Sequence, residues 1–290
     1  MTTELPAVEQ APAAPSPPRG GRARAARSLT VGGVLVGLVL AVALVSLLWT
    51  PYPLTDGSGP RLSGPTAEHW AGTDRLGRDL LTQLMLGARA AVVVAFLTTV
   101  LAAAIGVTVG VLAASATRWL DAALQTVVDL LIAFPTLLLA MLIVTVRGAS
   151  TASVVAAIGI AGSAVIARVT RVNAARVLRE DYVTAARAAG TGHLGVVLRH
   201  VLPNIAPTLL VQLMLLAGSA VLAEASLSYL GLGAPPPDPT WGRMLREAQS
   251  TIATAPTSAV LPGLGVATFV LGLNLLGDGI RERRDPELAR

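Results

Sequence analysis

Long stretches without any charged residue follow one another along the chain, separated by short segments that contain Arg, Asp or Glu. A helix that crosses a bilayer needs roughly 20 consecutive, mostly apolar residues. Six of the stretches reach or nearly reach that length, so the pattern predicts an all-α integral membrane protein with six transmembrane helices. The third is interrupted in its first part by Asp121 and Asp129. The predicted helices lie near residues 30–49, 90–116, 122–146, 149–167, 201–223 and 257–277.

The basic residues are distributed unevenly between the two sides that six crossings would create. If the N-terminus is cytoplasmic, 15 of them fall on the inner side and 7 on the outer side, as the positive-inside rule requires. Trp49, Trp70, Trp119 and Trp241 all fall at or beyond the ends of the predicted helices, where interfacial tryptophans are usually found. We therefore expect both termini to be cytoplasmic.

The composition agrees with a membrane protein and excludes several kinds of active site. Hydrophobic residues make up 53% of the chain and charged residues 13%, against about 25% charged residues in a soluble domain. The chain contains no Lys and no Cys. It therefore cannot form a Walker-A nucleotide site, a disulfide, a thiolate nucleophile or a Cys-zinc site. It also lacks the H-E-x-x-H and G-x-S-x-G motifs, so we expect no catalytic residue, no metal and no cofactor in this chain.

The net charge of +5 could indicate a protein that binds nucleic acid. The arginines lie beside apolar runs, however, and aromatic residues make up only 3% of the chain, which leaves few platforms on which bases could stack. We therefore expect contact with membrane lipid and none with nucleic acid.

The region before the first predicted helix is rich in Pro, Ala and Arg and has no apolar period. We interpret residues 1–28 as a disordered cytoplasmic tail, followed by a transmembrane helix at 29–50. A cleaved signal peptide is the alternative, because Ala41-Val42-Ala43 resembles a cleavage site. The long Pro-rich lead and the length of the apolar run favour an uncleaved helix.

The segment 168–203 differs from the other connections because it is long, rich in Arg and Ala, and patterned as two short helices. Helix-forming residues run from 181 to 189 and are stopped by Gly190-Thr191-Gly192. A second helical run follows at 193–200, and Pro203 suits the first turn of the next helix. The pattern predicts a helix–turn–helix whose Ala-rich side could dock in a groove of another protein. From composition alone, an Arg-rich loop that only fixes the topology is an equal alternative.

Several short sequences in this chain are similar to those of permeases from bacterial ABC importers. The run Thr184-Ala185-Ala186, with Gly190 and Leu202-Pro203, resembles the EAA loop of these proteins, although Thr184 stands where that family has Glu. Further runs resemble peptide-importer permeases and occur in the family's order across residues 68–288. They are Gly72-Thr73-Asp74-Arg75-Leu76-Gly77-Arg78-Asp79, Gly87-Ala88-Arg89, Asp129 to Pro135, Glu224 to Gly233, Pro239 to Gly242, and Asn274 to Gly279.

The chain thus resembles the C-type permease subunit of the dipeptide, oligopeptide and nickel ABC-importer family. The resemblance implies the type I importer permease fold and a location in the bacterial cytoplasmic membrane. It also implies three kinds of partner: a second, homologous permease, two ATPase subunits that bind ATP and Mg²⁺, and an extracytoplasmic substrate-binding protein. The implied layout is an extracytoplasmic segment at 51–89, a transmembrane domain at 90–280 with a coupling loop at 168–203, and a cytoplasmic tail at 281–290.

The resemblance also suggests roles for individual residues. Coupling to the ATPases is expected at Tyr182, Thr184, Ala185, Ala186, Arg187, Gly190, Leu202 and Pro203. An extracytoplasmic cap or partner contact is expected at Gly72, Thr73, Asp74, Gly77, Arg78 and Asp79, where a structural role is favoured over a solvated helix start. A role in the translocation path and a structural role both remain open for Asp129, Phe134, Pro135, Glu224, Asn274 and Asp278.

The expected cargo is a dipeptide or oligopeptide delivered by the binding protein. Nickel or another small solute is an alternative, because permeases of this type also import such cargo. A secondary transporter is a second alternative, but it would need paired charges within the membrane, and Asp129 is the only clear candidate in the middle of a predicted helix.

Overall fold

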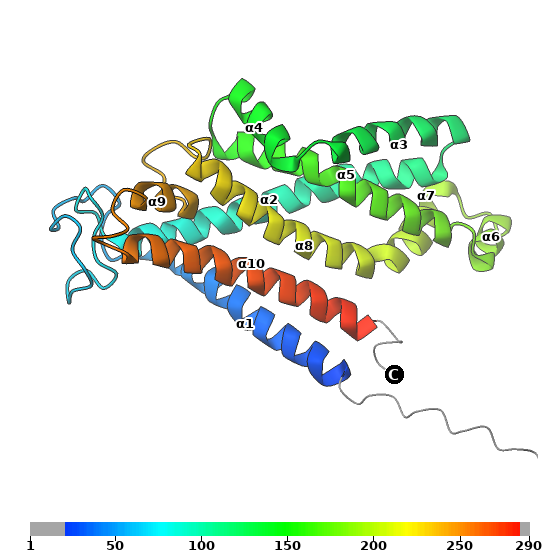
Figure 1. The fold of residues 1–290 in the computed structure, drawn as a ribbon. Helices are drawn as coiled ribbons and strands as arrows, with labels where there is room; N and C mark the ends of the chain where they lie inside the picture. Colours follow the sequence, from blue (N-terminus) through cyan, green and yellow to red (C-terminus); the bar gives the residue numbers. More distant parts are fainter. Residues whose placement is uncertain (1–20, 285–290) are drawn as a thin grey trace, which may run out of the picture.

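A computed structural model describes residues 21–284 of the chain. Figure 1 shows the arrangement of the helices in this range. The architecture is all-α, as predicted, and the only strand-like feature in this range is an isolated bridge between Thr73 and Asp79. The elements are α1 (Gly21–Leu48), α2 (Leu80–Ser115), α3 (Arg118–Ala133), α4 (Thr136–Arg147), α5 (Thr151–Val177), α6 (Asp181–Ala188), α7 (His193–Val196), the π-helical turn η1 (Val197–Val201), α8 (Leu202–Tyr229), α9 (Trp241–Ala248) and α10 (Thr257–Arg284).

Five continuous helical segments are long and apolar enough to cross a membrane. They are α1, α2, α5, the continuous segment α7–η1–α8, and α10. The third predicted crossing, 122–146, is not one helix: α3 and α4 are bent by 91° relative to each other. The break falls at Phe134 and Pro135 because a residue before proline is driven out of the helical region, and Phe134 is indeed extended (φ −79°, ψ 133°). We call this break the elbow.

Several helices extend beyond their predicted limits. Helix α2 begins at Leu80, ten residues before the predicted crossing, because the Asp79 side chain accepts a hydrogen bond from the Thr82 backbone N–H and caps the helix. Helix α1 begins at Gly21, so the part of the predicted tail from 21 to 28 is helical. The predicted tail at 1–20 and the last six residues of the predicted C-terminal tail, 285–290, lie outside the described residues.

The helices form a layered bundle in which α2, α5 and α8 lie between α1 and α10 on one edge and α3 and α4 on the other (Figure 1). Helix α2 packs most extensively on α5. Gly106 and Gly110 permit this close approach, since a Cβ at either position would come within 2.6 Å of α5 atoms. The spacing of small residues therefore serves packing within the chain. The pair Gly33 and Gly37 on α1 has the same spacing, but a Cβ at either position would have no described atom of another element within 4 Å.

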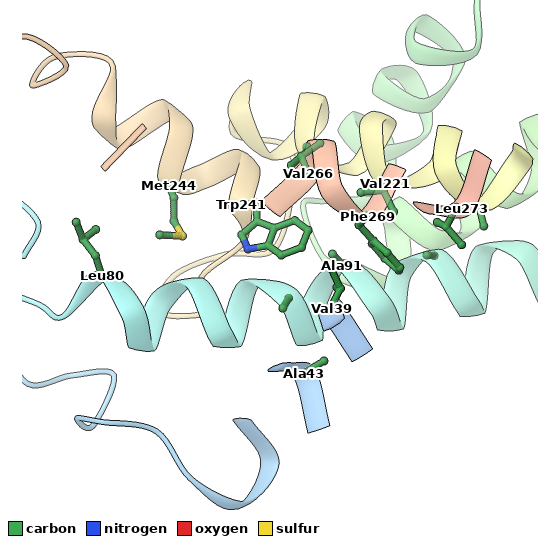
Figure 2. Close-up of a cluster of buried hydrophobic side chains, with 14 of the residues drawn as sticks. Val39, Ala43, Leu80, Ala91, Val221, Trp241, Met244, Val266, Phe269 and Leu273 are labelled. Carbon is green, nitrogen blue, oxygen red and sulfur yellow. The ribbon is translucent and has the colours of Figure 1, made fainter. Parts of the chain in front are cut away.

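Trp241, the first residue of α9, anchors the hydrophobic core at one end of the bundle (Figure 2). Its indole lies between Gly87 of α2 and Gly265 of α10, and its Nε1–H donates a hydrogen bond to the carbonyl oxygen of Leu84 at 3.1 Å. The buried neighbours in this cluster include Leu80, Met244 and Phe269. A short helix outside the spanning bundle is thus locked onto two spanning helices.

Candidate functional site

The helix–turn–helix predicted within 168–203 is present and projects from one end of the bundle (Figure 1). We call residues 181–201 the hook. Its first helix, α6, ends in a turn in which Gly190 has φ +90°, a conformation that favours glycine. Gly190 N–H donates to the Arg187 carbonyl at 2.9 Å, and Thr191 N–H donates to the Ala186 carbonyl at 3.0 Å. These bonds satisfy carbonyls at the helix end.

The hook is fastened to the bundle by buried valines and by one tyrosine. Val183 of α6 is fully buried in a cluster with Val196 of α7, Val201 of η1 and residues of α5 and α8. The Tyr182 hydroxyl accepts a hydrogen bond from Asn204 Nδ2 at 3.0 Å. Because α7, η1 and α8 are continuous, a force on the hook is transmitted directly to a spanning helix. The sequence interpretation did not include Val183, Val196 or Asn204. Val183 is the single buried residue of α6, so this helix has no apolar period that would reveal a buried face.

The outward surface of the hook combines small and apolar side chains with polar and charged ones. Thr184, Ala185 and Arg187 are exposed, whereas Ala186 is half-buried. Leu194 and Leu198 are 69% and 54% exposed and lie on the second limb of the hook. Leu202 and Pro203 lie in the first turn of α8, just beyond the hook. Exposed leucines beside small side chains are typical of a surface that another protein covers.

A cavity of about 540 Å³, lined by both arginines and acids, lies where α5 ends and α6 begins. Arg176 and Arg179 line it and are exposed. Arg171, a third lining residue, is bound in a bidentate ion pair by Asp121 of α3, with both N–O distances at 2.6 Å. This end of the molecule therefore combines a protruding hook with a cavity of mixed charge, because Glu180 and Asp181 also line it.

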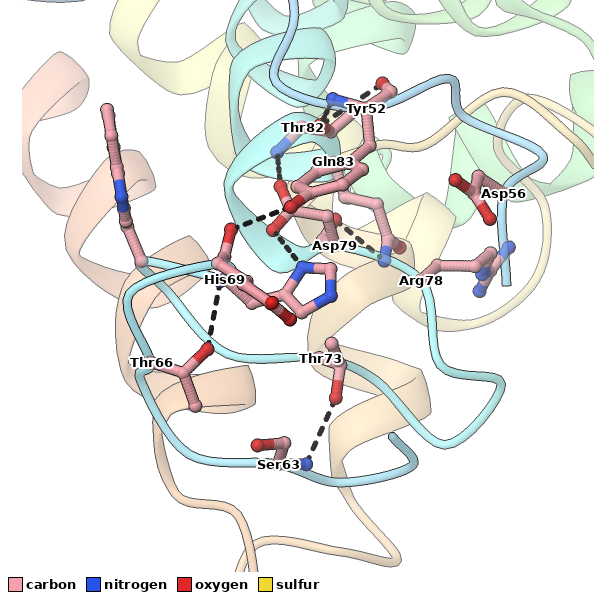
Figure 3. A network of polar contacts seen from close by, with 12 residues as sticks. Tyr52, Asp56, Ser63, Thr66, His69, Thr73, Arg78, Asp79, Thr82 and Gln83 are labelled. Carbon is pink, nitrogen blue, oxygen red and sulfur yellow. Dashed lines mark hydrogen bonds and ion pairs between the residues drawn. The ribbon is translucent and has the colours of Figure 1, made fainter. Parts of the chain in front are cut away.

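At the opposite end of the bundle, residues 51–79 form a compact segment that we call the cap (Figure 3). Asp79 holds it to α2, because one carboxylate oxygen accepts from Thr82 N–H at 2.7 Å and the other lies 3.0 Å from His69 Nδ1. Thr73 accepts from Ser63 N–H at 3.0 Å through its hydroxyl oxygen. Ser58 hydrogen bonds hold the pKa of Asp56 below its usual value.

Asp74 is the centre of the second half of the cap. One of its carboxylate oxygens accepts from the backbone N–H groups of Leu76 and Arg78 at 2.8 and 2.9 Å. The other accepts from Arg78 Nε at 2.7 Å and from Gln83 at 3.1 Å. Gly72 and Gly77 both have positive φ, and a Cβ on either would collide with a backbone carbonyl oxygen of the cap. The motif from 72 to 79 therefore builds a turn and a helix cap.

The cap is also joined to α9, over a long distance in sequence. Arg78 Nη2 donates to Glu247 Oε2 at 3.1 Å, and Arg243 Nε donates to Glu247 Oε1 at 2.9 Å. Neither Glu247 nor Arg243 was expected to contribute to the cap. Residues 169 positions apart carry no local signal of their pairing, so only the fold reveals it.

The remaining predicted residues are spread over the bundle and do not form one site. Asp129 pairs with Arg168 of α5, and both side chains are about half exposed. Phe134 is exposed at the elbow, beside Pro135. Glu224 is buried and accepts a hydrogen bond from the Ser228 hydroxyl at 2.6 Å.

The last two predicted residues, Asn274 and Asp278, lie on α10. The Asn274 amide oxygen lies beside Gly218 of α8. Asn274 therefore faces another spanning helix, and the tail beyond 284 is outside the described residues. Asp278 is exposed.

Comparison with known proteins gives consistent results. The sequence pattern of the family described as "binding-protein-dependent transport system inner membrane component" matches residues 106–290, which include the hook. The dipeptide transport system permease protein DppC of Alkalihalophilus pseudofirmus is 36% identical over 260 residues, which cover 89% of this chain and 85% of the relative. The glutathione transport system permease protein GsiD of Pectobacterium atrosepticum is 36% identical over 258 residues, covering 88% and 86%. GsiD of Escherichia coli O157:H7 is 36% identical over 226 residues, covering 78% and 75%.

Proposed function

Because this chain belongs to the family of binding-protein-dependent transport system inner membrane components, we propose that it is the permease subunit of an ATP-driven importer of dipeptides and oligopeptides. The observation that carries the proposal is the hook, which lies within the region shared with the family. A protruding helix pair, rigidly joined to a spanning helix, is suited to convert the movement of a bound motor into movement of the bundle.

The cargo is proposed from the relatives. One is named for dipeptide transport and another for glutathione transport, and glutathione is itself a small peptide. Both relatives align along more than four fifths of this chain and of their own length. Nickel or another small solute is the alternative cargo, and no feature of the described residues favours it.

The hook is the proposed contact for the ATPases. In this arrangement both termini and the hook are cytoplasmic, which agrees with the excess of arginine on that side. The contact would be made by Ala185, Arg187, Leu194 and Leu198, which are exposed. Thr184 has no carboxylate that could pair with a basic residue of an ATPase. The proposed contact therefore depends more on shape and on buried apolar area than on charge. The chain lacks Lys and so has no Walker-A site, and ATP and Mg²⁺ would be bound by the ATPase subunits.

A second permease is proposed to cover the α3–α4 edge of the bundle. Irregular backbone and charged side chains are costly in contact with lipid and occur at membrane depth only where protein or water covers them. The elbow has exposed residues from 133 to 138. Asp129, which is half-exposed in its ion pair with Arg168 of α5, lies on α3 shortly before the elbow. Exposed apolar side chains such as Leu38, Leu44 and Leu264 lie on the α1–α10 edge, where the helices are unbroken, and this edge suits lipid.

The proposed mechanism is alternating access. Closure of the two ATPases would move both hooks together and rock the two bundles as rigid bodies, so that the path opens alternately to the two sides. The binding protein would deliver peptide at the cap end. Catalytic chemistry on the cargo is not required of this chain.

Reconstitution tests the proposal. The chain, its partner permease, the two ATPases and the binding protein should together take up a labelled dipeptide into proteoliposomes only when ATP is present. The purified chain alone should neither hydrolyse ATP nor transport. Proton- or sodium-driven uptake by the chain alone would instead identify a secondary transporter, and ATP-dependent uptake of nickel without peptide uptake would identify the alternative cargo.

A further inference from the structure

A recess at the cap end of the bundle lies between α9, the turn that follows α8, and the cap. Its volume is about 490 Å³, within the range of roughly 300–1,000 Å³ that is usual for small-molecule sites. The cap and α9, which contribute to its lining, lie at the end of the molecule opposite the hook (Figure 1). The charged residues that line it are Arg75, Arg243, Arg246 and Glu247.

The charges in this recess do not balance. Both oxygens of Glu247 already accept hydrogen bonds, from Arg243 and Arg78, and Arg78 is also paired with Asp74. These two acids and two arginines neutralise one another. Arg75 and Arg246 also line the recess, are exposed, and form no ion pair within residues 21–284. The recess therefore keeps about two uncompensated positive charges.

The backbone makes room for one of these two guanidinium groups. Gly231 has φ +87°, and a Cβ at this position would collide with Nη1 of Arg246. Gly233, which also lines the recess, is equally tight, because its Cβ would collide with the Ser228 hydroxyl. The glycines in the turn after α8 thus leave room for the Arg246 guanidinium at the wall of the recess. No acid within residues 21–284 forms an ion pair with it there.

We propose that Arg75 and Arg246 form a binding site for a carboxylate, and that it receives the C-terminal carboxylate of the peptide as the peptide enters the permease. This inference rests on the proposed function. Guanidinium groups bind carboxylates through two parallel hydrogen bonds, and no acid that lines the recess has a free oxygen to compete. A free peptide always carries such a carboxylate, whatever its side chains.

The shape of the region supports a small ligand over an acidic patch on the binding protein. A protein surface would need only a flat basic patch, whereas these arginines lie in a recess. A second cavity of about 290 Å³ lies next to it and shares Ala234 with it. Leu54, Leu86 and Val93 line this second cavity, which offers apolar space for the side chains of a bound peptide.

The test uses the complete importer in proteoliposomes and the double variant Arg75→Gln/Arg246→Gln. Uptake of a labelled dipeptide is measured against the concentration of loaded binding protein, together with the rate of ATP hydrolysis. The double variant loses the charged hydrogen bonds to the peptide carboxylate, and this loss should lower the maximal uptake rate about tenfold. The KM for the binding protein and the stimulated ATPase rate should stay unchanged, because the motor and its docking contacts are intact. Arg61→Gln is the matched control, since Arg61 is exposed in the same cap and does not line the recess.

Three outcomes would overturn the inference. A higher KM for the binding protein at an unchanged maximal rate would show that the arginines bind that protein instead. An equal loss of uptake and of ATPase activity would show a structural role. Uptake equal to that of Arg61→Gln would show no role at all. Failure of the unmodified importer to take up any peptide would instead contradict the proposed function.

Discussion

The indole of Trp241 lies so close to Gly87 that a Cβ at position 87 would come within 2.6 Å of the indole Cδ1. Both residues belong to short motifs, and their contact joins α9 to α2. The Trp241 Nε1–H is satisfied by the carbonyl of Leu84 in the same turn of α2 as Gly87. The glycine therefore provides the space and the neighbouring carbonyl provides the acceptor for one buried aromatic side chain.

This contact predicts that Gly87→Val destabilises the protein, because a branched side chain would have to displace the indole. Overpacking of this kind costs about 1–3 kcal/mol, so thermal unfolding in detergent should occur at a lower temperature. Gly33→Ala is the control, since nothing in the described chain lies within 4 Å of a Cβ at position 33. Equal unfolding temperatures for the two variants would contradict the packing described for Trp241.

The cap predicts a second effect on stability. Asp79→Ala removes the N-cap of α2 and leaves His69 without its carboxylate partner. Loss of an N-cap costs about 0.5–2 kcal/mol, and Asp79→Asn should recover part of it because Asn also caps helices well. Limited proteolysis of the cap measures the effect locally. Glu68→Ala, an exposed change in the same segment, should leave the cleavage rate unaltered, and equal cleavage of all three variants would refute the capping role.

The positions of most spanning helices could be predicted from the sequence because a charge-free run of bilayer length has few other uses. The elbow was missed because residues 130–146 are uncharged on both sides of Pro135 and hydropathy does not register a bend, although Pro135 is itself a local signal for a break in a helix. The charge pattern predicts too late a start for α2. Arg89 ends the charge-free run on its N-terminal side, but it lies within the helix.

The functional regions were predictable to different degrees. The turn of the hook follows from Gly190 and its neighbours, which is local information. The bond between Arg78 and Glu247 and the recess around Arg246 depend on how α9 returns to the cap. These contacts are set by the tertiary fold, so the sequence alone did not reveal them. The roles expected for the hook residues stay predictions until the assembled importer is tested.

The ion pair between Asp121 and Arg171 predicts a coupling between α3 and α5. Asp121→Asn should weaken this attachment, because the amide carries no charge and its NH2 group cannot accept the second hydrogen bond from the guanidinium. The exchange Asp121→Arg/Arg171→Asp should restore part of the stability lost in either single variant. A double-mutant cycle on thermal unfolding measures the pair. Strictly additive effects would show that the two side chains do not interact in the folded protein.

The hook predicts a defect in transport without a defect in folding. Gly190→Val forces a branched side chain into a conformation with φ +90°, at a cost of roughly 1–2 kcal/mol, and should displace α6 relative to α7. Peptide uptake by the complete importer should fall while ATP hydrolysis continues, because the ATPases would no longer move α8 through the hook. Membrane insertion should be normal, since no spanning helix is altered.

Two further substitutions separate backbone strain from lost space at this turn. Gly190→Asn should retain most of the uptake, because Asn tolerates the left-handed conformation better than other residues do. Gly192→Ala should transport normally, since Gly192 has φ −65° and nothing lies near its Cβ position. If Gly190→Val transports as well as Gly192→Ala, then the turn does not transmit the motion of the ATPases, and the coupling contact must lie elsewhere on the chain.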